Sequence, residues 1–70
     1  MNMTIEEARE KFKIRTMVTK KNTKRKYFYE VIGHVELDND CFIELYKTYK
    51  GLGRVMYEKP ENLELAQLLQ

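Results

Sequence analysis

Hydrophobic and polar residues alternate along three stretches of this chain. The alternation runs over residues 12–18, 27–37 and 41–49. Because successive side chains of a β-strand point to opposite faces of a sheet, this period of two predicts three half-buried strands. A short fourth strand is expected over residues 54–58, after a turn at residues 51–53 that contains two glycines.

Two segments outside these stretches carry the signals of helices. Thr4 is followed three residues later by Glu7, which is the spacing of a capping box and predicts a short helix over residues 5–11. Pro60 fits the first position of a second helix near the other end of the chain. The apolar stripe of that second helix would consist of Leu65, Leu68 and Leu69.

The first two predicted strands can be paired in a register that suits both faces of the sheet. A two-residue turn at residues 22–23 would place Val18 opposite Tyr27 on one face. The same turn would place Arg15 opposite Glu30 on the other face, where the two charges attract each other. The sequence therefore predicts a tight hairpin here.

The second and third predicted strands also have a coherent register. A three-residue loop at residues 38–40 would place Leu37 opposite Cys41 and would keep the apolar side chains of both strands on one face. Gly33 stands in the middle of the second strand, where a glycine indicates a bend or a bulge. The sheet is therefore expected to curl.

These elements predict one small globular α+β domain over residues 1–70. Its core would be a four-stranded antiparallel meander, flanked by a short N-terminal helix and a C-terminal helix. A curled, SH3-like barrel is the alternative architecture. A chain of seventy residues buries only about 60–65% of the surface that its unfolded form exposes, so a homodimer or another partner would add stability.

The face of the sheet opposite the predicted core is not fully polar. Apolar and aromatic side chains recur on it, and two helices could cover it or leave it open to a partner. A bare face would favour a protein partner, and a covered face would favour binding through the charged turns. The residues expected to form this possible partner face are Phe28, Ile32, Phe42 and Tyr46.

Charge is distributed unevenly in a chain whose formal net charge is only +2. Residues 11–26 hold eight basic and no acidic side chains, whereas residues 27–44 hold five acidic side chains and no Lys or Arg. In a meander the first and third turns lie at the same end of the sheet, so their cations would form one basic pole. The residues expected to bind nucleic acid or another anion there are Lys20, Lys21, Lys24, Arg25, Lys26, Lys50 and Arg54.

The predicted hairpin places like charges opposite each other, because Lys20 faces Arg25 and Lys21 faces Lys24. Directly opposed like charges destabilise a ribbon, and an anionic partner would relieve the repulsion. Neighbouring aromatic rings could stack on unpaired bases. The alternative interpretation is a solubilising tip, because lysines also protect sheets against edge-to-edge aggregation.

The chemistry-bearing residues do not form a catalytic set. His34 would face Glu44 across two strands, but Ser is absent from the chain and Cys41 belongs to the opposite face. One Cys and one His cannot complete a protein-only zinc site, and no nucleotide-binding motif is present. The sequence therefore predicts no enzyme, no cofactor and no metal.

Two functions remain open. The first is a small non-enzymatic binding module that contacts nucleic acid or another polyanion through the basic pole. The second is a protein that docks on an acidic or apolar partner surface and regulates or inhibits that partner. In being short and rich in Lys and Tyr, the chain is similar to small accessory proteins of phages and mobile elements, which implies the second function. No signal peptide or membrane span is recognisable, so we expect a cytoplasmic protein.

Overall fold

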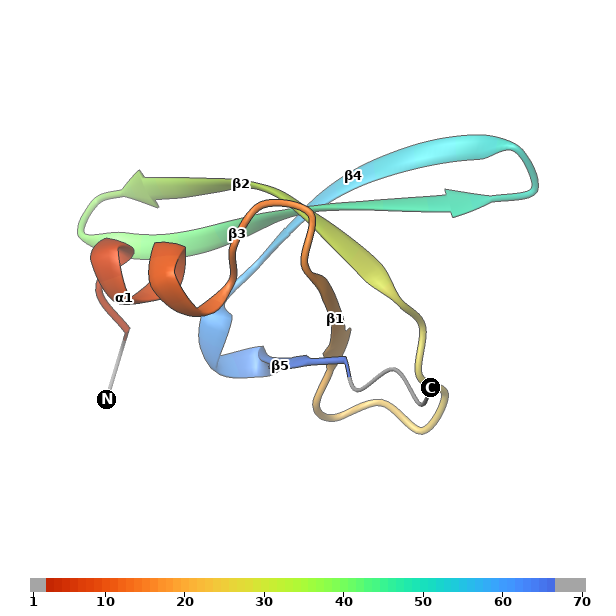
Figure 1. The fold of residues 1–70 in the computed structure, drawn as a ribbon, viewed down its shortest axis with the longest axis horizontal. Helices are drawn as coiled ribbons and strands as arrows, with labels where there is room; N and C mark the ends of the chain where they lie inside the picture. Colours follow the sequence, from red (N-terminus) through yellow and green to blue (C-terminus); the bar gives the residue numbers. More distant parts are fainter. Residues whose placement is uncertain (1–2, 67–70) are drawn as a thin grey trace.

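The computed structural model describes residues 3–66, which form one five-stranded antiparallel sheet with a short helix (Figure 1). The strand order is β4-β3-β2-β1-β5. No helix in this part of the chain is long enough to cross a membrane. In chain order the elements are α1 (Ile5–Lys11), β1 (Met17–Lys20), β2 (Tyr29–Leu37), β3 (Asp40–Tyr49), β4 (Leu52–Glu58), the 3-10 helix η1 (Pro60–Asn62) and β5 (Leu63–Leu65).

The predicted N-terminal helix is confirmed as α1, and its capping box is formed. The Thr4 hydroxyl accepts a hydrogen bond from the Glu7 backbone N–H at 3.1 Å, and the Glu7 carboxylate accepts one from the Thr4 backbone N–H at 2.9 Å. These bonds satisfy two backbone donors that the first turn of a helix would otherwise leave unpaired. The buried face of α1, with Ile5 and Ala8, then packs into the core.

The core lies between α1 and the inner face of the sheet. Apolar side chains from the helix, from the segment after it and from every strand but β4 are almost or fully buried there, and Met56 of β4 packs against them. The inner face of β3 is the face of Ile43 and Leu45, and the outer face is the face of Phe42, Glu44 and Tyr46. The largest fully buried side chains are those of Phe12, Ile43, Leu45, Leu63, Val18, Val31 and Pro60.

The predicted α+β fold, a four-stranded meander with a C-terminal helix, is wrong, because residues 3–66 form a mostly β fold with five strands and no second α-helix. Pro60 opens only a three-residue 3-10 turn, after which Leu63–Leu65 forms strand β5 and pairs with β1. Leu63 is fully buried, whereas Leu65, which a strand places on the same face two residues later, is 45% exposed. Pairing with the open edge of β1 satisfies backbone groups that the four-stranded meander would have left exposed. Leu68 and Leu69 lie outside the described residues.

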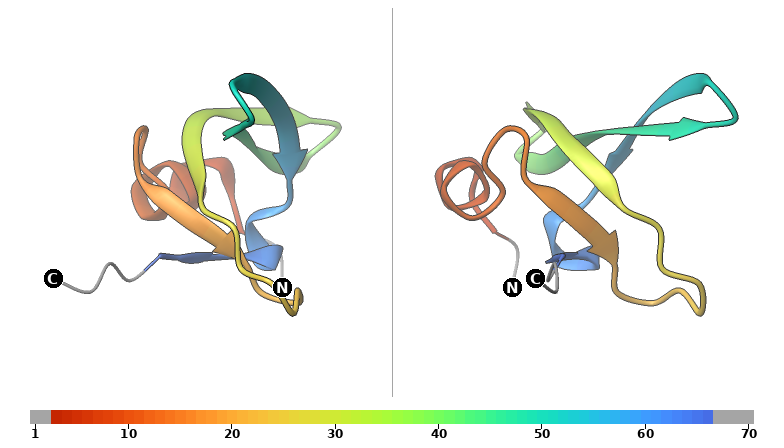
Figure 2. Two further views of the ribbon diagram at one scale, coloured as in Figure 1. Left: turned by 90° about the vertical axis from the view of Figure 1, so that its right-hand side faces the viewer. Right: turned by 45° about the vertical axis from the view of Figure 1, so that its right-hand side comes forward.

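The sheet is strongly curled (Figure 2). Strand β5 follows β4 after only four residues, 59–62, yet it lies at the opposite edge of the sheet. The Lys20 ammonium of β1 accordingly lies 3.7 Å from the Glu58 carboxylate of β4, although two strands separate β1 from β4 in the sheet order. The sheet therefore bends until its two edges approach each other at one end.

The predicted register of the first hairpin is wrong by two residues. Val18 pairs with Tyr29 rather than with Tyr27, and residues 21–28 form a loop instead of a two-residue turn at residues 22–23. A shift of two leaves every side chain on its original face. The hydrophobic pattern alone therefore could not distinguish the two registers.

The predicted register of the second hairpin is wrong by one residue at its tip. The turn has two residues, Asp38 and Asn39, whose positive φ angles of 52° and 68° suit a tight hairpin. Leu37 consequently pairs with Asp40 rather than with Cys41. The irregularity that Gly33 predicted is confirmed, because the register shifts between Val31 and Gly33.

This bulge decides which side chains reach the core. Val31 stays inside, whereas Val35 now pairs with Phe42 and Leu37 with Asp40, so that Val35 and Leu37 lie on the outer face. His34 takes the inner position opposite Ile43. The predicted pairing of His34 with Glu44 is therefore wrong.

Candidate functional site

The segment of residues 21–28, which we name the basic loop, projects from the end of the sheet between β1 and β2. Four of its side chains are cationic, and all of its residues are exposed. The loop is held at its base by Lys26, whose ammonium donates hydrogen bonds to the backbone carbonyls of Lys20 and Lys21 at 2.5 and 2.9 Å. The same ammonium lies 3.6 Å from the Glu64 carboxylate of β5. Lys26 therefore fixes the loop through its ammonium, although its side chain stays 42% exposed.

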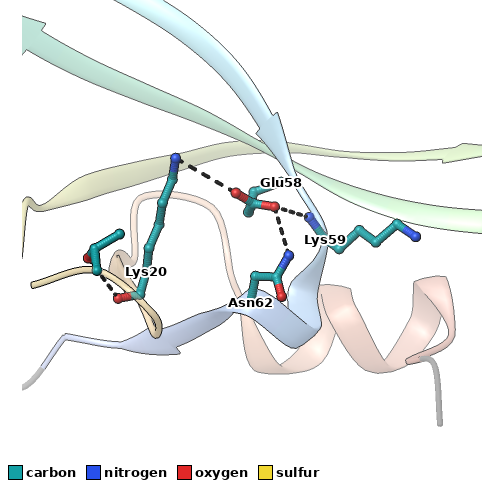
Figure 3. Close-up of polar contacts among 5 residues, drawn as sticks. Lys20, Glu58, Lys59 and Asn62 are labelled. Carbon is teal, nitrogen blue, oxygen red and sulfur yellow. Dashed lines mark hydrogen bonds and ion pairs between the residues drawn. The ribbon is translucent and has the colours of Figure 1, made fainter.

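Lys20 is also engaged within the protein. Its ammonium lies 3.7 Å from the Glu58 carboxylate and 5.4 Å from the centre of the Tyr29 ring. Glu58 accepts further hydrogen bonds from the Asn62 amide at 3.0 Å and from the Lys59 backbone N–H at 3.1 Å (Figure 3). Two of the predicted anion-binding cations, Lys20 and Lys26, thus form ion pairs with carboxylates of the chain itself.

The other cations of the basic loop are Lys21, Lys24 and Arg25, which are exposed. The Arg25 guanidinium donates a hydrogen bond to the Tyr27 hydroxyl at 3.3 Å, and this bond raises the pKa of Arg25 further. Arg25 therefore stays charged at every physiological pH. These side chains are the part of the loop best placed to meet an anion.

Tyr27 belongs to the basic loop and contacts the β3–β4 hairpin. The Lys47 ammonium of β3 lies 4.4 Å from the centre of its ring, which is within the range of a cation–π interaction. A shallow hollow of about 400 Å³ lies on the outer side of this pair and one of about 450 Å³ on the inner side. The two hollows share the lining residues Tyr27 and Lys47, and we name them together the aromatic groove. Their lining includes Lys26, Tyr27, Phe28, Tyr29, Tyr46, Lys47, Leu52 and Arg54.

The structure brings Arg54 to this groove, beside Tyr27 and Tyr29. Lys50 lies farther out, at the tip of the β3–β4 hairpin, where it has a φ of 52°. The basic loop and this tip project toward the same side of the molecule as two separate fingers (Figure 2). Of the cations predicted from the third turn, only Arg54 lines the groove.

Lys47 is the groove residue that the sequence analysis missed. It occupies an inner-face position in the alternation that contains Ile43 and Leu45. The sequence does contain a signal for it. Lys47 follows Ile43 and Leu45 at the same two-residue spacing, and a cation at such a position indicates that the inner face is no longer buried there. The ring of Tyr27 at that point could not be anticipated from a register in which Tyr27 faced Val18.

The predicted partner face is divided into two parts. Phe28 and Tyr46, which are 50% and 37% exposed, line the outer hollow of the aromatic groove, whereas Phe42 lies in a separate apolar patch. Ile32 is half-buried at the bulge. The patch, which we name the apolar patch, consists of Val35, Leu37, Phe42 and Tyr57 around a hollow of about 310 Å³.

Glu44 separates the two parts of that face. Its carboxylate accepts a hydrogen bond from the Tyr57 hydroxyl at 3.1 Å, and its side chain crosses over Gly33, where a Cβ atom would lie 2.5 Å from a carboxylate oxygen. The bond to the carboxylate raises the pKa of Tyr57. Glu44 therefore interacts on the outer face, whereas His34 lies on the inner face. The two side chains do not form the contact that acid–base chemistry needs.

The remaining chemistry-bearing residues have structural roles. The His34 ring nitrogen Nε2 lies 2.5 Å from the Phe12 carbonyl oxygen, where it ties the end of α1 to β2. Cys41 is buried, and burial raises the pKa of its thiol, which makes it a poor nucleophile. Within residues 3–66 no cluster of three or more His, Cys, Asp or Glu side chains could hold a metal ion.

Comparison with known protein families, characterised proteins and solved structures gave no match. The contacts around the basic loop and the aromatic groove are therefore the basis on which a function can be argued. What these contacts offer is a set of exposed cations next to half-exposed aromatic rings.

Proposed function

We propose that this chain is a small non-enzymatic protein that binds single-stranded nucleic acid through the basic loop and the aromatic groove. The observation that carries the proposal is the Lys47 ammonium 4.4 Å from the Tyr27 ring, with a hollow on either side of the pair. Phosphates would be contacted by Lys21, Lys24 and Arg25 of the loop and by Arg54 of the groove. Affinity would come mainly from released counterions and would carry little base specificity.

Exposed rings favour a single strand over a duplex. Tyr27 and Phe28 are 39% and 50% exposed beside the cations, and such rings can stack on unpaired bases. The bases of a duplex are already stacked on one another and offer no free face. A ring beside a cation is also a common arrangement in grooves that track a single strand.

The test is fluorescence anisotropy with single-stranded and double-stranded DNA and RNA, titrated from low to moderate salt. For four phosphate contacts on a single strand, the affinity should fall about 50-fold between about 50 and 200 mM salt. Reversing the loop charges with Lys21→Glu, Lys24→Glu and Arg25→Glu should abolish binding. Unchanged binding of every oligonucleotide by this triple variant would overturn the proposal.

A matched control keeps the same net charge but spares the loop. Arg9→Glu, Lys13→Glu and Lys59→Glu also replace three exposed cations, so both triple variants change the formal net charge from +2 by six, to −4. If the loop is the binding site, the control variant keeps most of its affinity for the single strand. Equal loss in both variants would indicate general attraction by net charge.

A second function is favoured by the apolar patch, which residues 3–66 leave uncovered. Leu37 and Tyr57 are 61% and 57% exposed there. Through this patch the chain would bind a partner protein and regulate or inhibit that partner. Such a role is expected for an accessory protein of the phage or mobile-element type. A partner retained from a native lysate by the loop triple variant but lost with Leu37→Glu would support this function, and a partner retained by both would exclude the patch.

The wider setting is part of the same proposal. We propose that the protein acts in the cytoplasm, and that a homodimer would add stability to so short a chain.

A further inference from the structure

Strand β4 is an edge of the sheet. It pairs with β3 on one side, and none of the described residues pairs with its other side (Figure 1). The strand has seven residues, contains no Pro and shows no bulge in its pairing with β3. A regular edge of this length presents a row of backbone donors and acceptors that another strand can satisfy.

The side chains of β4 alternate in a way that suits pairing with a copy of itself. Arg54, Met56 and Glu58 share the inner face, and Val55 and Tyr57 share the outer face. Met56 lies midway between a cation and an anion. A two-fold axis at Met56 would thus place unlike charges opposite each other, because residues at equal distances from the axis are paired.

In that antiparallel register Arg54 lies opposite Glu58 of the second copy, and the pair occurs twice. Val55 lies opposite Tyr57 of the second copy, also twice, which is a favourable pairing of a β-branched with an aromatic side chain. Val55 and Tyr57 are 53% and 57% exposed in the single chain, so both have apolar surface to bury. Both faces of the new pairing are therefore complementary.

Other registers are poorer. An axis at Val55 would place Arg54 opposite Met56 and Leu52 opposite Glu58, which leaves both charges unpaired. An axis at Arg54 would place the two Arg54 side chains opposite each other, and like charges so placed repel. An axis midway between two residues would place inner-face residues opposite outer-face residues.

We propose that two copies of this chain associate through their β4 edges in antiparallel register about Met56. The two five-stranded sheets then become one continuous sheet of ten strands. The apolar patches of the two copies lie on the outer face of that sheet, on either side of the new strand pair, because Tyr57 belongs to both the patch and the edge. This interface shares Arg54 with the proposed phosphate contacts, but its tests measure association of the chain without nucleic acid.

The first test mixes two charge variants. Arg54→Glu alone places the introduced carboxylate opposite Glu58 of the second copy, twice, and Glu58→Arg alone places two arginines opposite each other twice, so each variant should be monomeric. In an equimolar mixture each carboxylate faces a guanidinium, and a heterodimer should form. Sedimentation equilibrium should show a single-chain mass of 8.5 kDa for each variant and twice that mass for the wild type and for the mixture.

Glu58→Arg also removes the ion pair of Glu58 with Lys20, so its fold is checked by circular dichroism, and a second variant pair avoids this position. Val55→Lys with Tyr57→Lys places lysines opposite each other at the edge and should abolish the dimer. Val35→Lys with Leu37→Lys adds the same charges to the outer face of β2 and should leave the dimer intact.

A wild-type protein that remains monomeric up to about 1 mM would overturn the proposal, because a dissociation constant above that value corresponds to less than about 4 kcal/mol of association. A dimer lost in the Val35 and Leu37 variant but kept in the Val55 and Tyr57 variant would overturn the β4 interface and assign the dimer to the apolar patch. A mixture of folded charge variants that stays monomeric would exclude the register about Met56.

Discussion

The ring of Tyr46 lies over Gly53 of the neighbouring strand, where a side chain on Gly53 would collide with it. Gly53 pairs with Thr48, two residues along β3 on the same face, so the ring leans diagonally from β3 onto β4. Gly53 was predicted to be a turn residue, but the turn consists of Lys50 and Gly51, and Gly53 lies within the strand. Because Gly53 has no side chain, the Tyr46 ring can occupy this space beside the outer hollow.

Gly53→Ala should therefore move the Tyr46 ring without unfolding the protein. The ring is 37% exposed and can swing into solvent, so the free energy of unfolding should fall by less than about 1 kcal/mol. Gly51→Ala tests backbone strain without a steric clash, because Gly51 has a φ of 79° and open space around it. It should cost about 1–2 kcal/mol through backbone strain and leave the ring in place. Urea unfolding and the NMR shifts of the Tyr46 ring measure the two effects, and unmoved ring shifts in Gly53→Ala would contradict the packing.

Leu63→Ala should be far more damaging than Leu65→Ala. Leu63 is fully buried in the core, and truncation of a buried leucine typically costs about 2–5 kcal/mol. Leu65 is 45% exposed on β5, so its truncation should cost less than about 1 kcal/mol. Thermal unfolding of the two variants measures the difference. A larger loss for Leu65 would point to the helical stripe predicted from the sequence rather than to strand β5.

The sequence predicted β2, β3, β4 and α1 because these depend on local patterns. The strand expected over residues 12–18 is wrong, because β1 is Met17–Lys20 and Ile14 of the preceding turn is 52% exposed. Alternation marks β2 and β3 whatever their partners are, and a turn with two glycines marks the start of β4. The Thr4 and Glu7 capping box acts within one turn of the chain. The segment after Pro60 carries both a helical spacing and a strand spacing of leucines. Which spacing prevails is decided by the open edge of β1, a tertiary feature that no local pattern contains.

The candidate site was predictable in its charges and less so in its geometry. The cations of the basic loop are evident from composition, but the engagement of Lys20 by Glu58 and of Lys26 by Glu64 depends on the curl that brings β4 and β5 to β1. A two-residue error in the first hairpin also hid the contact of Tyr27 with Lys47. Register errors of this size conserve the face of every residue, so they change neighbours without violating the pattern.

Lys26→Met should loosen the basic loop. The substitution removes the hydrogen bonds to the Lys20 and Lys21 carbonyls and the ion pair with Glu64, while it keeps most of the volume of the side chain. Hydrogen exchange of the loop amides should become faster, and the free energy of unfolding should fall by about 1 kcal/mol. Lys24→Met is the control, because it removes an exposed cation of the same loop and should leave exchange unchanged. Equal exchange rates in the two variants would show that Lys26 does not hold the loop.

Stability should decrease in acid in part through Glu7. Its carboxylate accepts hydrogen bonds from the backbone N–H and the hydroxyl of Thr4, and these bonds lower the pKa of Glu7 below its usual value of 4.5. A group with a lowered pKa in the folded state stabilises the fold above its unfolded pKa, and that contribution is lost as the pH falls through the folded pKa. Glu7→Ala should therefore destabilise the protein at pH 7 and have a smaller effect at pH values below the folded pKa.

Glu10 provides the matched control for this pH dependence. It is an exposed glutamate of the same helix but lies outside the capping box, so Glu10→Ala should give no comparable change in stability between neutral and acidic pH. Urea unfolding of the wild type and both variants at a series of pH values measures the difference. If the cost of Glu7→Ala were the same across the whole series, the carboxylate charge would play no part in capping α1, and the hydrogen bond to Thr4 would have to act independently of ionisation.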